Sequence, residues 1–286
     1  MKILVTGSNG QLGNELKVLA SNYRTFQFLF HDVDTLDITN NEQLNKLFDV
    51  EKPLFVINCA AYTAVDKAET DTQTATLINA TAVKNLVECC IVNNARLIHV
   101  STDYVFDGTA HLPYKETDKV NPQSAYGRTK LEGEIEAQKD ERSLVIRTSW
   151  LYSSFGNNFV KTVIRLSSER PEIGMIFDQI GSPTYAADLA NTILQIVNQL
   201  KDTPNRKGGI YHFSNEGVCS WYDFALKIAQ MKGNTSCKIK PIETHQYPLP
   251  ANRPAYSVLN KAKIKSDFNI EIPWWETSLQ LCIHKM

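Results

Sequence analysis

Residues 2–13 of the chain read KILVTGSNGQLG, a short apolar run that meets a turn with glycines at positions 7, 10 and 13. A helical pattern follows, so the predicted order is strand, glycine turn, helix. Glycines permit a tight turn and let backbone N–H groups approach a pyrophosphate, whose charge a helix N-terminus favours. A glycine triplet is a weak signal alone, but here it opens the first strand–helix unit. The sequence therefore predicts a dinucleotide site that includes Gly7, Gly10, Gln11, Leu12 and Gly13.

Short apolar runs alternate with segments of helical periodicity in the first half of the chain. The expected strands are residues 2–6, 26–30, 54–60, 96–101 and 144–147. The run at 54–60 is continuously apolar, which is typical of a parallel sheet that is covered on both faces. Strands alternating with helices imply right-handed crossovers. The predicted fold class is therefore α/β, a doubly wound, Rossmann-like parallel sheet.

The pattern loosens beyond Trp150, which indicates a second, smaller region. We expect residues 1–150 to form an NAD(P)-binding Rossmann domain that is rejoined by about 180–215, where residues 211–213 look like a strand that returns to the sheet. Residues 151–179 and 216–286 are expected to form a C-terminal α/β region that binds substrate. Within it, Ser220 is the expected N-cap of a helix, with Asp223 three residues on.

Polar or small residues follow several of the expected strands. Ligands of a doubly wound sheet bind beyond the carboxyl ends of its strands, so these residues should open on one edge of the sheet. For the cofactor the prediction adds Asp37, Ile38, Ala61, Tyr62 and Thr63, and beside them it places Thr102 and Asp103.

A tyrosine and a lysine stand four residues apart in residues 124–130, SAYGRTK, at the start of an expected helix. Side chains at i and i+4 lie on one face of a helix. Such pairs also occur by chance on many helix surfaces. Beside a dinucleotide site, however, an ammonium near a phenol would lower the phenol pKa from its ordinary value near ~10. Tyr126 is therefore a candidate general acid or base, with Lys130 as its partner.

The composition is that of an ordinary globular protein. The chain has 30 basic and 31 acidic residues, a net charge of −1, so it lacks the basic excess typical of proteins that bind nucleic acid or anionic membranes. The expected partners are small molecules or further copies of the chain, a homodimer included.

Localisation is predicted from the cysteines and the apolar runs. The six cysteines show no CxxC spacing and read as buried apolar residues in a reducing compartment. The first residues form a strand rather than a signal peptide, and no later apolar run nears the ~18 residues of a membrane span. We therefore expect a cytoplasmic protein.

Several motifs resemble one known family. They are GQLG at 10–13, CAAYTAVDKAE at 59–69, STDYVFDG at 101–108, RTSW at 147–150 and GSPT at 181–184. The glycine loop, the strand end at 101–103 and the Tyr126/Lys130 pair look like an extended short-chain dehydrogenase/reductase. The longer motifs are similar to the dTDP-4-dehydrorhamnose reductase family, from residue 2 to about residue 275.

The resemblance implies reduction of the 4-keto group of dTDP-4-dehydro-6-deoxy-L-mannose to dTDP-L-rhamnose, in nucleotide-sugar synthesis for cell-surface polysaccharide. Tyr126 would donate the proton, Lys130 would lower the Tyr126 pKa and bond the nicotinamide ribose, and Thr102 would hold the substrate carbonyl. It also implies that Asp103 and Trp150 contact the sugar.

Cofactor and metal are less sharply specified. The second strand ends in His31 and Asp32, and an acidic group there favours NADH. The family is assigned NADPH and some members accept both, so NADPH is expected, with NADH tolerated. Some members bind Mg²⁺ at a dimer interface. Glu15 fits one ligand position, but Ala186 and Ala187 stand where another acid is expected, so Mg²⁺ is not supported and no metal ligand is predicted.

Three other functions share parts of this pattern. A nucleotide-sugar 4,6-dehydratase needs a Glu after the Thr–Asp pair, and this chain has Tyr104 there. A non-catalytic NADP-binding subunit of the methionine adenosyltransferase regulatory type shares the fold, but the intact Thr102, Tyr126 and Lys130 favour an enzyme. A reductase of another dTDP-4-keto-6-deoxyhexose also fits the residues.

Overall fold

The computed structural model describes residues 1–203, 205–234 and 236–286. Its main feature is a six-stranded sheet in the order β10-β5-β4-β3-β1-β2, in which every neighbouring pair is parallel. Its strands are β1 (Lys2–Thr6), β2 (Gln27–Phe30), β3 (Phe55–Asn58), β4 (Arg96–Thr102), β5 (Leu144–Thr148) and β10 (Gly209–His212). The predicted doubly wound parallel sheet is confirmed, and the chain re-enters it through β10.

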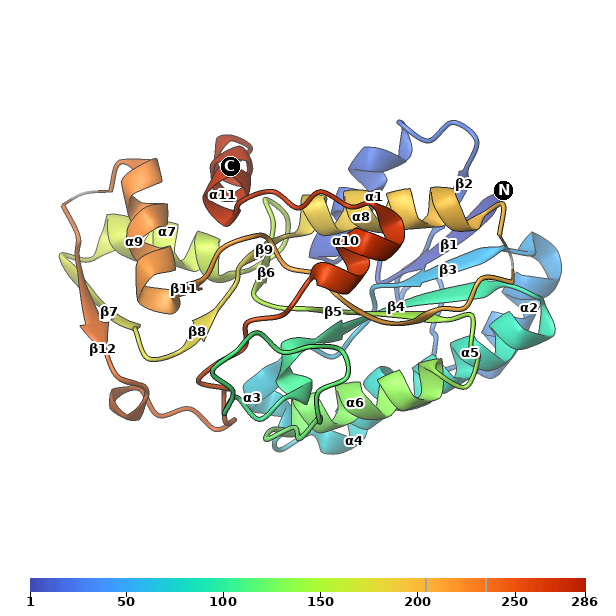
Figure 1. Cartoon of the computed structure of the whole chain (residues 1–286), viewed down its shortest axis with the longest axis horizontal. Coiled ribbons are helices and arrows are strands. Elements are labelled where there is room, and N and C mark those ends of the chain that lie inside the picture. The colour runs from blue at the N-terminus through green and yellow to red at the C-terminus, as the bar shows by residue number, and fades with distance from the viewer. Residues whose placement is uncertain (204, 235) are drawn as a thin grey trace.

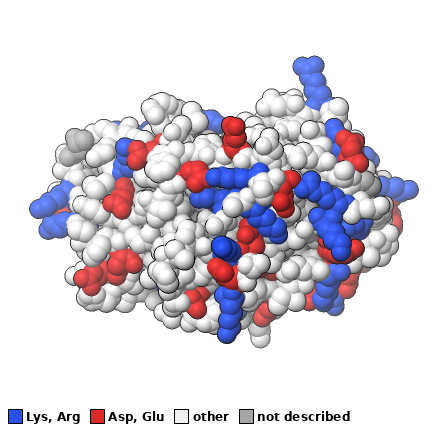
Figure 2. All heavy atoms as spheres, viewed as in Figure 1, with Lys and Arg blue, Asp and Glu red and all other residues white. Residues whose placement is uncertain are grey.

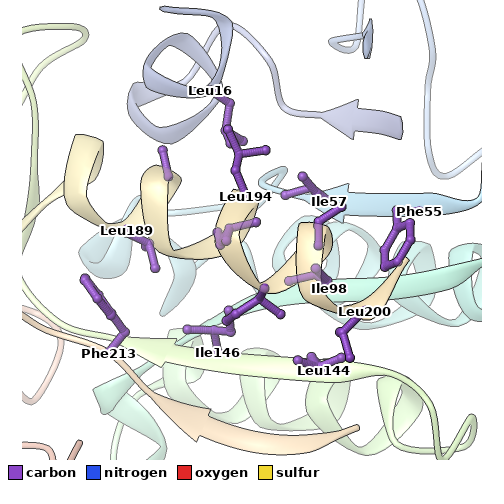
Figure 3. Close-up of a cluster of buried hydrophobic side chains, with 14 of the residues drawn as sticks. Leu16, Phe55, Ile57, Ile98, Leu144, Ile146, Leu189, Leu194, Leu200 and Phe213 are labelled. Carbon is purple, nitrogen blue, oxygen red and sulfur yellow. The ribbon is translucent and has the colours of Figure 1, made fainter. Parts of the chain in front are cut away.

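Helices cover both faces of this sheet (Figure 1). One face is covered by α1 (Gln11–Ala20), α8 (Ala186–Leu200) and α10 (Ala262–Phe268), and the other by α2 (Asn41–Glu51), α5 (Ala82–Val92) and α6 (Ala125–Ala137). Successive strand residues point to opposite faces, so Ile3 and Val5 join the first core and Leu4 joins the second. Figure 3 shows Leu200 of α8 near Leu144 of the sheet, and Leu194 on the side of the helix toward Leu16 of α1.

One long helix lies on the second face. The elements α4 (Thr72–Thr76), η1 (Leu77–Thr81) and α5 run on as a helix of 21 residues, Thr72–Val92, with the length and composition of a membrane span. No apolar run of this length was predicted from the sequence. Val83 and Leu86 are fully buried against the sheet, which is the packing of a core helix.

A second apolar core lies beside the carboxyl ends of the strands (Figure 1). Its main elements are α7 (Phe159–Glu169), α9 (Trp221–Lys232), α11 (Trp275–His284) and the parallel pair β7 (Glu172–Ile176) and β12 (Lys238–Ile242). Helix α9 begins with a capping box of Ser220 and Asp223, as predicted. Residues Ile264 and Phe268 of α10 pack instead in the core of the sheet.

Short elements join these parts. They are α3 (Val65–Ala68), η2 (Asp103–Val105), β6 (Leu151–Tyr152), β8 (Ile180–Gly181), β9 (Thr184–Tyr185), β11 (Cys219–Ser220) and η3 (Thr244–Gln246). On the face shown in Figure 2, Lys and Arg side chains lie among Asp and Glu side chains. Among the ion pairs, the Lys261 ammonium lies 3.3 Å from Glu216 Oε2.

Candidate functional site

The glycine turn joins β1 to α1 in a conformation that excludes larger residues. Gly7 has a φ of +65°, and a Cβ there would lie 2.5 Å from the backbone nitrogen of Ala60. A Cβ on Gly13 would lie 2.5 Å from the Cα of Ser8. Helix α1 begins after Gly10, which has no side chain to cap the first N–H groups. The turn therefore presents backbone donors and a helix N-terminus to a phosphate group.

A cavity of about 1010 Å³ opens on this turn and runs along the carboxyl ends of the strands. Most predicted site residues line it: Gly7, Gly10, Gln11, Leu12, Asp37, Ile38, Ala61, Thr63, Thr102, Asp103, Tyr126, Lys130 and Trp150. Gly13 and Tyr62 do not line it. Gly13 packs beneath the turn, and the Tyr62 hydroxyl donates to Asp71 Oδ2 at 3.1 Å.

Thr102 and Asp103 lie where β4 ends, and both are buried. The Thr102 hydroxyl donates to Asp103 Oδ1 at 2.9 Å and accepts from the backbone N–H of Tyr104 at 3.2 Å. Asp103 Oδ2 is buried and has no hydrogen-bond partner among the residues described. Burial raises the pKa of Asp103 to about 6, against the opposing influence of Thr102, Ser257 and the backbone N–H groups of Asp103 and Tyr104. The carboxyl is thus held ready to accept or give a proton near neutral pH.

Tyr126 and Lys130 lie on α6, whose N-cap Ser124 accepts from the backbone N–H of Gly127. Burial raises the pKa of Tyr126 to about 12, and a hydrogen bond with Thr102 opposes the rise. The Lys130 ammonium donates to the Val100 carbonyl at 2.7 Å. The prediction that Lys130 lowers the Tyr126 pKa is therefore wrong, because desolvation outweighs the other influences on the phenol and the ammonium bonds to β4.

Behind Lys130 lies a buried ion pair. The Arg147 guanidinium donates through Nε and through Nη2 to the two carboxylate oxygens of Glu134, at 2.9 and 2.7 Å, and the Ser101 hydroxyl donates to Glu134 Oε1 at 2.5 Å. All three side chains are buried. This network ties α6 to β4 and β5, and so fixes the helix that carries Tyr126 and Lys130.

Trp150 closes the cavity on the side of the second core. Its backbone is in the left-handed region, with a φ of +49°, which is costly for a large residue and marks a constrained position. Its ring stacks on Trp221 of α9, with centroids 3.6 Å apart and an interplanar angle of 9°. A Cβ on Gly181 would meet the same ring at 2.7 Å, so that glycine makes room for the indole.

The start of α7 contributes lining residues that the sequence analysis did not assign to the site. Gly156 and Asn157 reach the cavity, and the Asn158 amide, which caps α7, donates to Gln11 Oε1 at 3.0 Å. Two helix N-termini therefore meet at Gln11. A Gly–Asn–Asn run before an amphipathic helix was the signal available, and it needed the fold to place it beside the glycine turn.

The acidic residue at the end of β2 is engaged by backbone groups. Asp32 Oδ2 accepts from the N–H of Asn9 at 2.8 Å, and Oδ1 from the N–H of Val33 at 2.9 Å. The Lys17 ammonium donates to Asn9 Oδ1 at 2.9 Å. The carboxylate therefore braces the glycine turn, with a cation close by.

The carboxylates of Glu15 and of Asp188, which follows Ala187, already accept hydrogen bonds. Glu15 is buried and accepts from the Ser153 hydroxyl at 2.6 Å, while Asp188 accepts from the Asn215 amide at 2.6 Å. Within the described parts of the chain, no cluster of three or more His, Cys, Asp or Glu side chains could hold a metal ion.

Comparison with known proteins agrees with this geometry. The chain is 42% identical over 286 residues to a dTDP-4-dehydrorhamnose reductase of Aggregatibacter actinomycetemcomitans, covering 98% of this chain and 97% of that protein. The solved structure of a dTDP-4-dehydrorhamnose reductase from Clostridium acetobutylicum has a TM-score of 0.93 and 43% identity, over 99% of both chains. A dTDP-4-dehydrorhamnose reductase from Bacillus anthracis, solved in complex with NADP, has a TM-score of 0.92 and 38% identity, over 100% of this chain and 99% of that one.

A family model described as the RmlD substrate binding domain matches residues 1–286. The predicted resemblance is confirmed, and the chain belongs to the RmlD family.

Proposed function

We propose that this protein reduces the 4-keto group of dTDP-4-dehydrorhamnose to give dTDP-L-rhamnose, with NADPH as the hydride donor. The observation that carries the proposal is the meeting of Thr102, Tyr126 and Lys130 with a glycine turn in one cavity. The relatives named for this reaction support it, because the chain matches them over nearly their full length.

The cavity fits a dinucleotide. The turn at Gly7 and Gly13 leaves no space for a Cβ, and the uncapped start of α1 offers N–H groups to a pyrophosphate. Asp37, Ile38, Ala61 and nearby lining residues would hold the adenosine and nicotinamide ends of the cofactor. The bound dinucleotide supplies the hydride.

Cofactor preference follows from the end of β2. Each Asp32 oxygen accepts one backbone N–H group and keeps a further lone pair, so the carboxylate can still bind a ribose hydroxyl of NADH. Lys17 adds positive charge close to the turn. This arrangement supports NADPH as the cofactor with NADH accepted, and the NADP complex of the Bacillus anthracis relative points the same way.

The chain's own residues perform the proton transfer. Because its pKa is raised to about 12, the Tyr126 phenol stays protonated at neutral pH and can give its proton to the oxygen that becomes basic as the ketone is reduced. The Thr102 hydroxyl, beside Tyr126, would bond the same oxygen. Lys130 would bond the nicotinamide ribose, and Asp103 and Trp150 would contact the sugar.

The proposal also covers substrate binding and localisation. We assign substrate binding to the elements around the second core, above all Trp150 and its partner Trp221. We place the protein in the cytoplasm, where its six unpaired cysteines would remain reduced.

The test supplies purified protein with dTDP-4-keto-6-deoxyglucose and a 3,5-epimerase, and follows loss of absorbance from NADPH and NADH in parallel. We expect Tyr126→Phe to lower turnover by about 10²–10⁴-fold with NADPH affinity retained. Tyr23→Phe, which alters a tyrosine stacked on Phe26 outside the cavity, is the matched control and should keep full activity. An active Tyr126→Phe variant, or sugar product without oxidation of cofactor, contradicts the proposal.

A further inference from the structure

A buried polar chain runs from β1 through β3 and β4 to Lys130, and the reaction described above does not use it. Asn58 and His99 are fully buried and lie opposite each other in the register of β3 and β4. The Asn58 amide nitrogen is 3.1 Å from His99 Nδ1, and His99 Nε2 is 3.5 Å from Lys130 Nζ. The inference that follows rests on the proposed function, in which Lys130 stands beside the proton donor.

The orientation of the Asn58 amide is fixed by its neighbours. Asn58 Oδ1 accepts from the backbone N–H of Ala60 at 3.2 Å and from the Thr6 hydroxyl at 2.7 Å. A backbone N–H can only donate, so the atom that faces it must be the amide oxygen. The amide NH₂ group therefore faces His99 and donates to Nδ1.

This contact determines the tautomer of His99. A ring nitrogen that accepts a hydrogen bond carries no proton, and a neutral imidazole then has its proton on the other nitrogen. Burial, and after it the positive charge of Lys130, hold the pKa of His99 well below its ordinary value, so the ring is neutral. Its Nε2–H group consequently points at Lys130 Nζ.

We propose that Asn58 holds His99 as the tautomer with its proton on Nε2, and that this N–H group opposes the ammonium form of Lys130. An ammonium has three donors and no acceptor, whereas an amine can accept the bond from Nε2–H and still donate to the Val100 carbonyl. His99 and Asn58 are thus positioning residues that set the charge of the lysine.

The other groups that face Lys130 shift its pKa in opposite directions. Glu134 on the same helix and Cys59 beyond β3 favour the ammonium, but Arg147 already pairs with the Glu134 carboxylate. Burial is the largest influence and lowers the pKa of Lys130 to about 8. The Nε2–H group of His99, on β4, lowers the pKa of Lys130 further.

The tautomer is measured on the protein alone by the ¹⁵N shifts of its histidine rings. His212 provides an internal reference, because its Nδ1 lies 3.1 Å from the Tyr114 carbonyl and its Nε2 lies 3.5 Å from the Arg147 guanidinium, which can only donate. His212 must therefore carry its proton on Nδ1. We expect His99 to show the opposite pattern, and a proton on Nδ1 of His99 overturns the proposal.

Two variants then test the effect on Lys130. Asn58→Asp and Asn58→Leu both remove the donor to Nδ1, so each should move the His99 proton to Nδ1. Each should also raise the titration midpoint of Lys130, followed through its labelled Cε, by about one pH unit, a tenfold change. A midpoint that rises only in the Asp variant reports the added charge and overturns the proposal, as does an unchanged midpoint in both.

Asn85→Leu is the matched control, because it removes another buried amide, one that bonds the carbonyls of Ile38 and Thr39. It should leave His99 and Lys130 unchanged. If the Asn58 variants do not fold, the wild-type spectrum still decides the tautomer. None of these readouts needs turnover, so a protein with the expected tautomer and no reductase activity would refute only the proposed function.

Discussion

Asp103 should destabilise the folded protein at neutral pH, and Asp103→Asn should remove that cost. The side chain is 2% exposed, and one of its oxygens has no partner in the described structure. A rise of its pKa from the ordinary 3.8 to about 6 corresponds to about 3 kcal/mol. The folded state holds the proton between these values while the unfolded state has lost it, so stability falls as pH rises through this window and stays low above it.

The assay is urea unfolding of both proteins at pH 4.5 and at pH 8. The asparagine has no charge to desolvate, so its advantage over wild type should grow by about 2 kcal/mol between the two pH values. At pH 8 the free energy of unfolding of Asp103→Asn should exceed that of wild type by less than about 3 kcal/mol. The new amide N–H group is buried without a partner, which costs about 1–2 kcal/mol.

Asp107→Asn is the matched control, since the Asp107 carboxylate accepts hydrogen bonds from Thr109 that lower its pKa to about 2. The stability that the ionised Asp107 carboxylate contributes is already complete above pH 3.8. The Asp107→Asn variant should therefore lose the same stability at pH 4.5 and pH 8. A stability difference between wild type and Asp103→Asn that does not change with pH would refute the reasoning.

Three further changes test the turn, the ion pair and the core. Gly13→Ala places a Cβ against the Ser8 backbone and should weaken NADPH binding at least ~10-fold, measured by calorimetric titration. Glu134→Gln leaves the Arg147 charge buried without its carboxylate and should cost about 3–5 kcal/mol in urea unfolding. Leu189→Ala opens a cavity between α8 and the sheet and should cost about 2–5 kcal/mol by the same assay, with the cofactor affinity unchanged.

Local signals predicted much of the fold. The apolar runs, the glycine turn and the capping box at Ser220 are each encoded within a few residues, because propensity, periodicity and capping act locally. An apolar helix as long as Thr72–Val92, in which η1 joins α4 to α5, was not predicted from the sequence. The stack of Trp150 on Trp221 could not be predicted either, because it joins residues 71 positions apart.

The candidate site, like the fold, was predicted from the sequence only in part. Most residues that follow strands line one cavity at the same edge of the sheet, as predicted, because parallel strands end together, whereas Tyr62 turns to Asp71. The effect of burial on the pKa values of Tyr126 and Lys130 was not predicted. Spacing puts Lys130 one turn from Tyr126, yet only the folded chain shows that its ammonium bonds the Val100 carbonyl and that desolvation dominates both side chains.

One physical rule links the groups at the end of β4. Burial shifts the pKa of Tyr126 and Asp103 upward and that of Lys130 downward, so each shift favours the neutral form. Behind the site, the charges of Glu134 and Arg147 compensate each other. A ketone that becomes an alkoxide then meets the Tyr126 phenol, whose own loss of a proton is costly, so the proton moves only as the oxygen gains charge. The same burial that destabilises these side chains thus couples proton donation to hydride arrival, and relieving it by mutation should add stability and remove catalysis together.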